Sequence, residues 1–235
     1  MASSRRFFVH AAPPPSRFGR AAVAALTALV ITACAAAPAA ATEGQYGSDC
    51  LPPPDPYTGT FHALYAAGMI DLRNPIHMDF TSCDPPPPPV PGPGTDHTFG
   101  SNVRAEISIG GGPFNTVQAP ATTRVTVMYC CPGPGGREVF DTEMLQLDIT
   151  GGTLPPGAMI RESPTRASTG RTTIRPTGGG GYAIDSFFDI FTELSLDGGQ
   201  TWMPQESPPG HMELTPSVPT PTRAGTWGRL KILYR

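Results

Sequence analysis

The stretch that most constrains the fold is residues 182–197, in which apolar and polar side chains alternate. The even-numbered positions carry most of the apolar side chains, and the odd-numbered positions carry every charge. A period of two is typical of a half-buried β-strand, because successive side chains point to opposite faces of a sheet. The run is long for one strand, so we expect a bend or bulge near residues 186–187.

The alternating run ends in Asp-Gly-Gly, which is a strong signal for a β-hairpin turn. The pattern Ser-x-Asp-x-Gly-x-Thr-Trp at this point resembles the Asp-box of sialidases and related β-proteins. Its defining positions are Ser195, Asp197, Gly199, Thr201 and Trp202. In those families the motif lies at hairpin turns away from the catalytic centre. The resemblance therefore implies a structural turn, in which Asp197 accepts backbone N–H bonds and Trp202 packs over the hairpin.

The rest of the chain contains further short strand-like segments and no convincing amphipathic helix. They cover residues 60–66, 76–81, 97–109, 122–129, 139–149, 159–163, 172–175 and 211–214. Many short strands separated by Gly/Pro turns favour a β-sandwich. A weak internal repeat, residues 105–112 against 192–199, agrees with two facing sheets. We therefore predict an all-β protein, an antiparallel β-sandwich over residues 57–216.

The first part of the chain predicts export. Residues 1–41 read as a signal peptide, because an arginine-bearing segment precedes a small, apolar stretch. Two cleavage positions compete: before Thr42, or before Cys34, which follows a lipobox-like Ile-Thr-Ala and would then carry a lipid. The early arginine pair also resembles a twin-arginine signal, which competes with the general secretory route. The expected location is the periplasm, outer envelope or extracellular space.

Proline-rich segments divide the remainder. Residues 42–56 form a proline-rich lead, and residues 85–94 form a proline-rich linker that cannot join a sheet. Residues 217–235 form a C-terminal tail, either a sorting-tag-like segment or an ordered terminal strand. The formal net charge of −3 and the single lysine, Lys231, leave no basic stripe. We therefore expect no nucleic acid partner.

Four cysteines follow the predicted signal peptide, and four cysteines allow three pairings. We expect Cys50 to pair with Cys83 and so to attach the lead to the first hairpin. Cys130 and Cys131 are neighbours at a strand end, so we expect their side chains to diverge. A metal site made of all four cysteines lacks the usual spacing, and we expect no metal and no cofactor.

Two groups of side chains are candidates for chemistry. The first group, His62, His77 and His97 with Asp79 and Asp96, contains metal-ligand residue types without a recognised ligand spacing. The second group is Asp141, Glu143, Glu162, Asp189 and Glu193. Two of these carboxylates would serve glycoside hydrolysis if they lay about 5–9 Å apart in a sugar-binding cleft. Exposed strand faces explain both groups equally well.

Residues 61–214 resemble a group of secreted, uncharacterised bacterial proteins, many of which look like PEP-CTERM exported proteins. The resemblance rests on residues 61–65, 140–145, 161–165 and 185–189. The resemblance ends at residues 218–221, because these residues are not followed by an apolar helix and an arginine cluster. We expect an exported, non-enzymatic envelope or extracellular β-module for adhesion or binding, with a carbohydrate or surface partner. The alternative is a small secreted, carbohydrate-directed hydrolase that uses two of the carboxylates.

Overall fold

The computed structural model describes residues 43–217, and this part of the chain is built from strands without a helix. The strands are β1 (Gly44–Tyr46), β2 (Tyr57–Thr58), β3 (His62–Tyr65), β4 (Ile70–Met78), β5 (Thr95–Ile109), β6 (Asn115–Gly133), β7 (Arg137–Thr150), β8 (Met159–Glu162), β9 (Ser168–Pro176), β10 (Tyr182–Ile190), β11 (Thr192–Ser195), β12 (Met203–Pro204) and β13 (Gly210–Leu214). Every pair of neighbouring strands is antiparallel. The predicted all-β, antiparallel class is confirmed.

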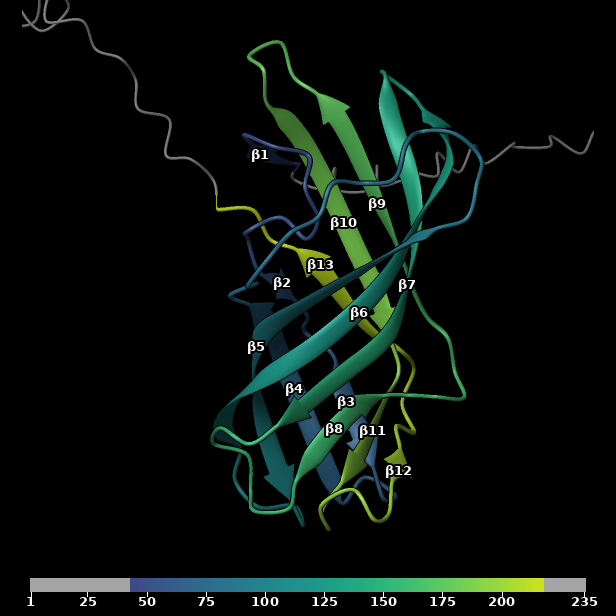
Figure 1. Cartoon of the computed structure of the whole chain (residues 1–235). Coiled ribbons are helices and arrows are strands. Elements are labelled where there is room, and N and C mark those ends of the chain that lie inside the picture. Colours follow the sequence, from purple (N-terminus) through teal and green to yellow (C-terminus); the bar gives the residue numbers. More distant parts are fainter. Residues whose placement is uncertain (1–42, 218–235) are drawn as a thin grey trace, which may run out of the picture. The chain divides into compact units, whose positions relative to one another are not determined.

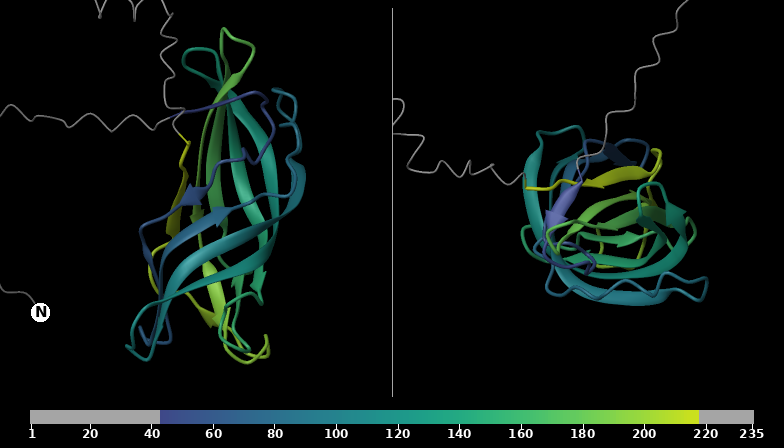
Figure 2. Two further views of the ribbon diagram at one scale, coloured as in Figure 1. Left: turned by 90° about the vertical axis from the view of Figure 1, so that its left-hand side faces the viewer. Right: turned by 90° about the horizontal axis from the view of Figure 1, so that it is seen from above.

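The sheet closes on itself into a barrel of 8 strands, so the predicted pair of facing sheets is wrong (Figure 1). Around the barrel the strands follow the order β10, β13, β2, β4, β5, β6, β7 and β9, and β9 pairs with β10 again. The ring is seen end-on in the right-hand view of Figure 2. Alternation shows which face of a strand is buried but does not identify its partner. The closing strand β9 was predicted only as a short segment, so closure was missed.

The interior of the barrel holds the apolar half of each alternating strand. On β6 the buried positions recur at every second residue from Val117 to Val127. The largest fully buried side chains include Tyr65, Phe140 and Leu194. The period-two pattern in the sequence therefore sorts side chains between the barrel interior and solvent.

The central alternating run breaks at Phe191 instead of bending near residues 186–187. Before the break, β10 pairs with β9 and β13; after it, β11 pairs with β8 and β12. The Phe191 N–H donates to the Ser168 hydroxyl at 3.0 Å, and the Phe191 carbonyl accepts from the Ser163 N–H. The change of strand partners at this point explains why the break lies here.

The proline-rich segments differ in how they join the barrel. Residues 85–94 contain no strand. The lead is part of the fold, because β1 pairs with β10 and Leu51 is buried and bridged to Asp84. The predicted signal peptide, Cys34 and the tail beyond residue 217 lie outside the described residues. Within residues 43–217 no helix is long and apolar enough to cross a membrane.

Candidate functional site

The Asp-box residues form a tightly hydrogen-bonded turn between β11 and β12. The Asp197 carboxylate accepts the N–H of Gln200 at 3.0 Å and the N–H of Thr201 at 2.9 Å. The Thr201 hydroxyl donates to the second carboxylate oxygen at 2.6 Å. The Ser195 hydroxyl donates to Asp197 at 2.7 Å and accepts the Gly199 N–H at 2.9 Å. Donors from the turn itself therefore surround the carboxylate.

These hydrogen bonds also stabilise the ionised form of the Asp197 carboxylate. They hold the pKa of Asp197 at about 2, and the Thr201 hydroxyl makes the largest contribution. The half-buried Trp202 donates its ring N–H to the Gly199 carbonyl at 3.1 Å, and the Arg161 guanidinium lies 4.0 Å from the ring centre. Asp197 and Trp202 thus have intramolecular partners typical of a structural turn.

The candidate metal ligands of the described chain do not assemble into one site, although His77 and His97 both face the barrel interior. His62 contacts Asp71 at 2.9 Å at an exposed position, whereas His77 is buried and contacts the Ser101 hydroxyl at 2.6 Å. Burial lowers the pKa of His77 to about 4, so this ring is neutral at pH 7. Asp79 accepts from Asn102, and Asp96 accepts from Thr126. In the described part of the chain, no three metal-binding side chains gather into a ligand set.

Three of the candidate carboxylates have separate basic partners. Asp141 pairs with Arg171 at 2.8 Å, and Glu193 pairs with Arg161 at 2.7 Å. Asp189 lies 2.8 Å from His211. These contacts account for the three carboxylates as structural groups, without a catalytic role.

Glu162 is the candidate carboxylate with the most altered environment. Burial, with smaller contributions from the nearby Glu143 and Glu193, raises the pKa of Glu162 to about 7. A hydrogen bond from the Ser168 hydroxyl at 3.0 Å opposes this shift. The structure therefore brings part of the predicted acidic group together, while Asp141 and Asp189 pair elsewhere.

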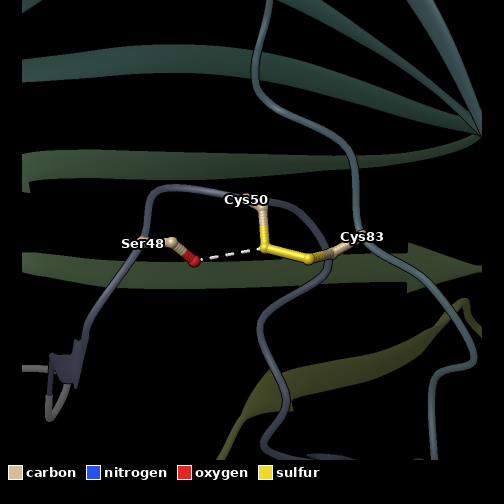
Figure 3. The surroundings of a disulfide bond; sticks show 3 residues. All are labelled: Ser48, Cys50 and Cys83. Atoms are coloured by element: carbon tan, nitrogen blue, oxygen red, sulfur yellow. Dashed lines mark hydrogen bonds between the residues drawn. A yellow bond between two sulfur atoms is a disulfide. The ribbon is translucent and has the colours of Figure 1, made fainter.

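The cysteines form two different arrangements. Cys50 and Cys83 form the expected disulfide, and the Ser48 hydroxyl contacts the Cys50 sulfur (Figure 3). Cys130 and Cys131 are unbonded, and their sulfur atoms lie 3.0 Å apart. The expected divergence of these two side chains is wrong, because a bulge in β6 between Tyr129 and Cys131 interrupts the alternation.

Closure of the barrel creates a feature that the sequence did not indicate, an internal cavity of about 90 Å³. Apolar side chains dominate its lining, which includes Phe99, Met144 and Met212. No carboxylate of the described residues lines it. Apolar lining with a few polar groups is typical of small-molecule sites.

His97 is the unusual polar side chain of this cavity. It is 1% exposed, and neither ring nitrogen has a hydrogen-bond partner within the described structure. The Thr142 hydroxyl, also in the lining, is buried and without a partner as well. Burial lowers the pKa of His97, and Asp84, the Leu51 backbone and Asp96 partly offset this shift. Buried polar groups without partners are rare, and each one calls for an explanation such as a bound water, an ion or a functional role.

The disulfide holds residues that form one part of the cavity wall. Leu51 and Pro52 line the cavity, and both follow Cys50 directly. The backbones of Leu51 and Asp84 exchange hydrogen bonds at 2.8 and 2.9 Å. Phe80, on the other side of the disulfide, also lines the cavity. The cross-link thus holds two loops together at the cavity wall.

Comparisons of the chain with protein-family models, with curated proteins and with solved structures gave no match. The resemblances to Asp-box proteins and to PEP-CTERM exported proteins therefore rest on the residues quoted above.

Proposed function

We propose that the chain is an exported, non-enzymatic β-barrel module that binds a small, mostly apolar molecule inside the barrel. The observation that supports this most is the internal cavity, in which an apolar lining surrounds the unpartnered ring of His97. A barrel of about eight strands has room for a filled core or for one small ligand. Here the core is nearly filled, which restricts the size of the ligand.

The chemistry of the lining specifies the ligand class. A neutral histidine ring offers one N–H donor and one acceptor nitrogen, so it suits a hydroxyl or similar polar group. The volume of about 90 Å³ is below the roughly 150 Å³ of an engineered cavity that holds benzene. Met144 and Met212 are flexible side chains that can move to admit a single ring. The ligand is therefore an apolar body of up to about one ring with one hydrogen-bonding group.

The hydrolase alternative has less support. The cavity contains no carboxylate of the described residues, and three of the five candidate carboxylates contact basic side chains. The raised pKa of Glu162 would suit a general acid, but neither Glu162 nor the nearby Glu143 and Glu193 line the cavity. We therefore favour binding over hydrolysis.

Export is the second part of the proposal. It is supported by the arginine-bearing, alanine-rich sequence of residues 1–41 and by the Cys50–Cys83 disulfide, since disulfides persist in oxidising compartments. Fractionation of cells that carry a tagged copy should recover a processed chain outside the cytoplasm. A full-length cytoplasmic product would contradict export. Cys34→Ala tests the lipoprotein route, because only a lipoprotein would lose membrane attachment through this change.

Binding is tested with phenol and benzene, two probes that differ by one hydroxyl group. Calorimetry should show that phenol binds several-fold more tightly than benzene, because one net hydrogen bond contributes about 0.5–1.5 kcal/mol. His97→Leu should abolish this preference while leaving benzene binding in place. Asp197→Ala is the matched control and should retain the preference. No binding of either probe to the folded wild type, or a preference that survives His97→Leu, would contradict the proposal.

A further inference from the structure

Cys130 and Cys131 form an exposed pair of thiols on β6. Their sulfur atoms are 3.0 Å apart, and no other cysteine within residues 43–217 lies outside a disulfide. On a regular strand, adjacent side chains point to opposite faces. Here Tyr129 pairs with Phe140 and Cys131 pairs with Val139, so Cys130 is the extra residue of a bulge. The bulge explains why the two sulfur atoms meet.

The pair lies where solvent can reach it. The pairing of β5 with β6 ends at Thr95 and Val127, so from Met128 onward β6 pairs with β7 alone. This arm leads to the β6–β7 turn at the upper end of the barrel in Figure 1, opposite the β11–β12 turn. Both cysteines are exposed. A soluble small molecule can therefore approach both sulfur atoms along the open edge of the arm.

Two charged side chains lie near the thiols. Asp141 and Arg171, an ion pair at 2.8 Å, lie close enough to influence them. The hydrogen bond to Cys131, with a smaller contribution from Asp141, raises the pKa of Cys130 to about 11. Cys130 is therefore held as the neutral thiol at neutral pH. Arg171 supplies positive charge beside a thiolate when one forms.

We propose that Cys130 and Cys131 are a redox site that exchanges with small disulfides and closes reversibly into a vicinal disulfide. One thiol loses its proton to water, and its thiolate attacks a sulfur of a disulfide R–S–S–R, forms a mixed disulfide and releases the first RS⁻. The neighbouring thiol loses its proton to water, and its thiolate displaces the second RS⁻. Each released RS⁻ takes up a proton. In sum, the protein dithiol is oxidised to a disulfide, and R–S–S–R is reduced to two RSH.

The geometry also predicts that this disulfide is easily reduced. Adjacent Cα atoms lie about 3.8 Å apart, whereas disulfides usually join Cα atoms about 4.4–6.8 Å apart. A bond formed outside that range is strained, and strained, exposed disulfides are the labile ones. Cys50 and Cys83, with Cα atoms 5.4 Å apart, are the reference within the same molecule.

The test equilibrates the full chain with mixtures of reduced and oxidised glutathione, blocks free thiols with N-ethylmaleimide, and maps tryptic peptides by mass. Arg124 and Arg137 bound a peptide, residues 125–137, that carries Cys130, Cys131 and no other cysteine. We expect this peptide to lose both tags together as the mixture becomes oxidising. We also expect it to reopen at glutathione ratios that leave Cys50–Cys83 intact. Both tags retained at every ratio, or a midpoint equal to that of Cys50–Cys83, would overturn the proposal.

Three variants sharpen the test, and each alters only exposed positions. Cys130→Ser and Cys131→Ser should stop at a stable mixed disulfide with glutathione, because no second thiol can displace it. The double change Cys130→Ser with Pro132→Cys keeps two adjacent cysteines but moves them off the bulge, so ring closure should fall at least tenfold. Ring closure equal to wild type in this variant would show that the bulge does not position the sulfurs and would also overturn the proposal. An unchanged melting temperature verifies that each variant is folded.

Discussion

The polar side chains of the Asp197 turn and of the His97 cavity differ in exposure and in hydrogen bonding. The Asp197 carboxylate is exposed to solvent, yet it accepts bonds from Ser195, Gln200 and Thr201. The His97 ring is buried, yet it has no hydrogen-bond partner within the described structure. Water can replace the donors of the exposed Asp197 carboxylate, whereas bulk water does not reach the buried His97 ring.

This difference separates a structural motif from a candidate binding site. A polar group whose bonds are all made within one turn stabilises that turn and has little capacity left for a ligand. A buried polar group without a partner costs about 1–3 kcal/mol, which a ligand can recover by hydrogen bonding to it. The recognisable sequence motif is therefore the structural element. The position that carries our functional proposal, His97, lies in no motif.

The largest expected effect comes from removing the disulfide that holds the cavity wall. Changing Cys50 and Cys83 to Ser together should lower the free energy of unfolding by about 3–4 kcal/mol, because the cross-link closes a loop with a sequence separation of 33. Chemical denaturation would measure this, and the melting temperature should fall by about 10 °C. Hydrogen exchange should accelerate at Leu51 and stay unchanged at Gly199. Equal acceleration at both positions would mean that the two regions do not behave independently.

Acid should weaken the interior before it weakens the turn. The folded chain binds a proton at His77 only near pH 4, whereas the unfolded chain binds one near pH 6.5, so stability is lost as the pH falls through this window. The loss at His77 should reach about 3 kcal/mol by pH 4. The contribution of Asp197 is complete above its unfolded pKa of 3.8 and is lost as the pH falls toward 2.

Denaturation of wild type, His77→Leu and Asp197→Asn across the pH range would separate these two windows. Glu162 acts in the opposite direction, because its raised pKa makes stability fall as the pH rises from 4.5 to about 7. The informative quantity is therefore the difference between each variant and the wild type. The His77→Leu difference should change between pH 6.5 and 4, and the Asp197→Asn difference only below pH 4. If the two differences changed over the same pH range, the contrast between the interior and the turn would be wrong.

A smaller effect is expected from the aromatic ring of the turn. Trp202→Ala removes the N–H bond to Gly199 and the contact with Arg161. The ring is half-buried, so the loss should be about 2 kcal/mol, less than the 3–5 kcal/mol of a fully buried ring. Phenol binding should persist at low temperature, as calorimetry would show. Lost binding in a folded variant would place the ligand at the turn instead of in the barrel.

The smallest effects are expected at the exposed ion pairs. Asp141→Asn and Asp189→Asn should each change the free energy of unfolding by no more than about 0.5 kcal/mol, because exposed pairs contribute little. Neither change should alter phenol binding. If either variant abolished a measured glycoside hydrolysis, the hydrolase alternative would replace the binding proposal.

The sequence predicted local structure better than the arrangement of the sheet. Alternation identified the long strands, and the Asp-Gly-Gly signal located the turn at Asp197, because both depend on neighbours along the chain. Barrel closure depends on β9 pairing with both β7 and β10, which alternation cannot show. The same limit hid the environment of His97, which was grouped with metal ligands. The meeting of Cys130 with Cys131 depends on a bulge set by the pairing of β6 with β7.

The most direct measurement is the ¹⁵N NMR signal of the histidine rings during a phenol titration. We expect the His97 ring signals to move in saturable fashion in wild type and in Asp197→Ala, while those of the exposed His62 and His211 stay in place. His97→Leu assigns the signals by deleting them. Histidine signals that all stay unchanged at saturating phenol, or that move at His62 or His211 instead, would contradict binding inside the barrel.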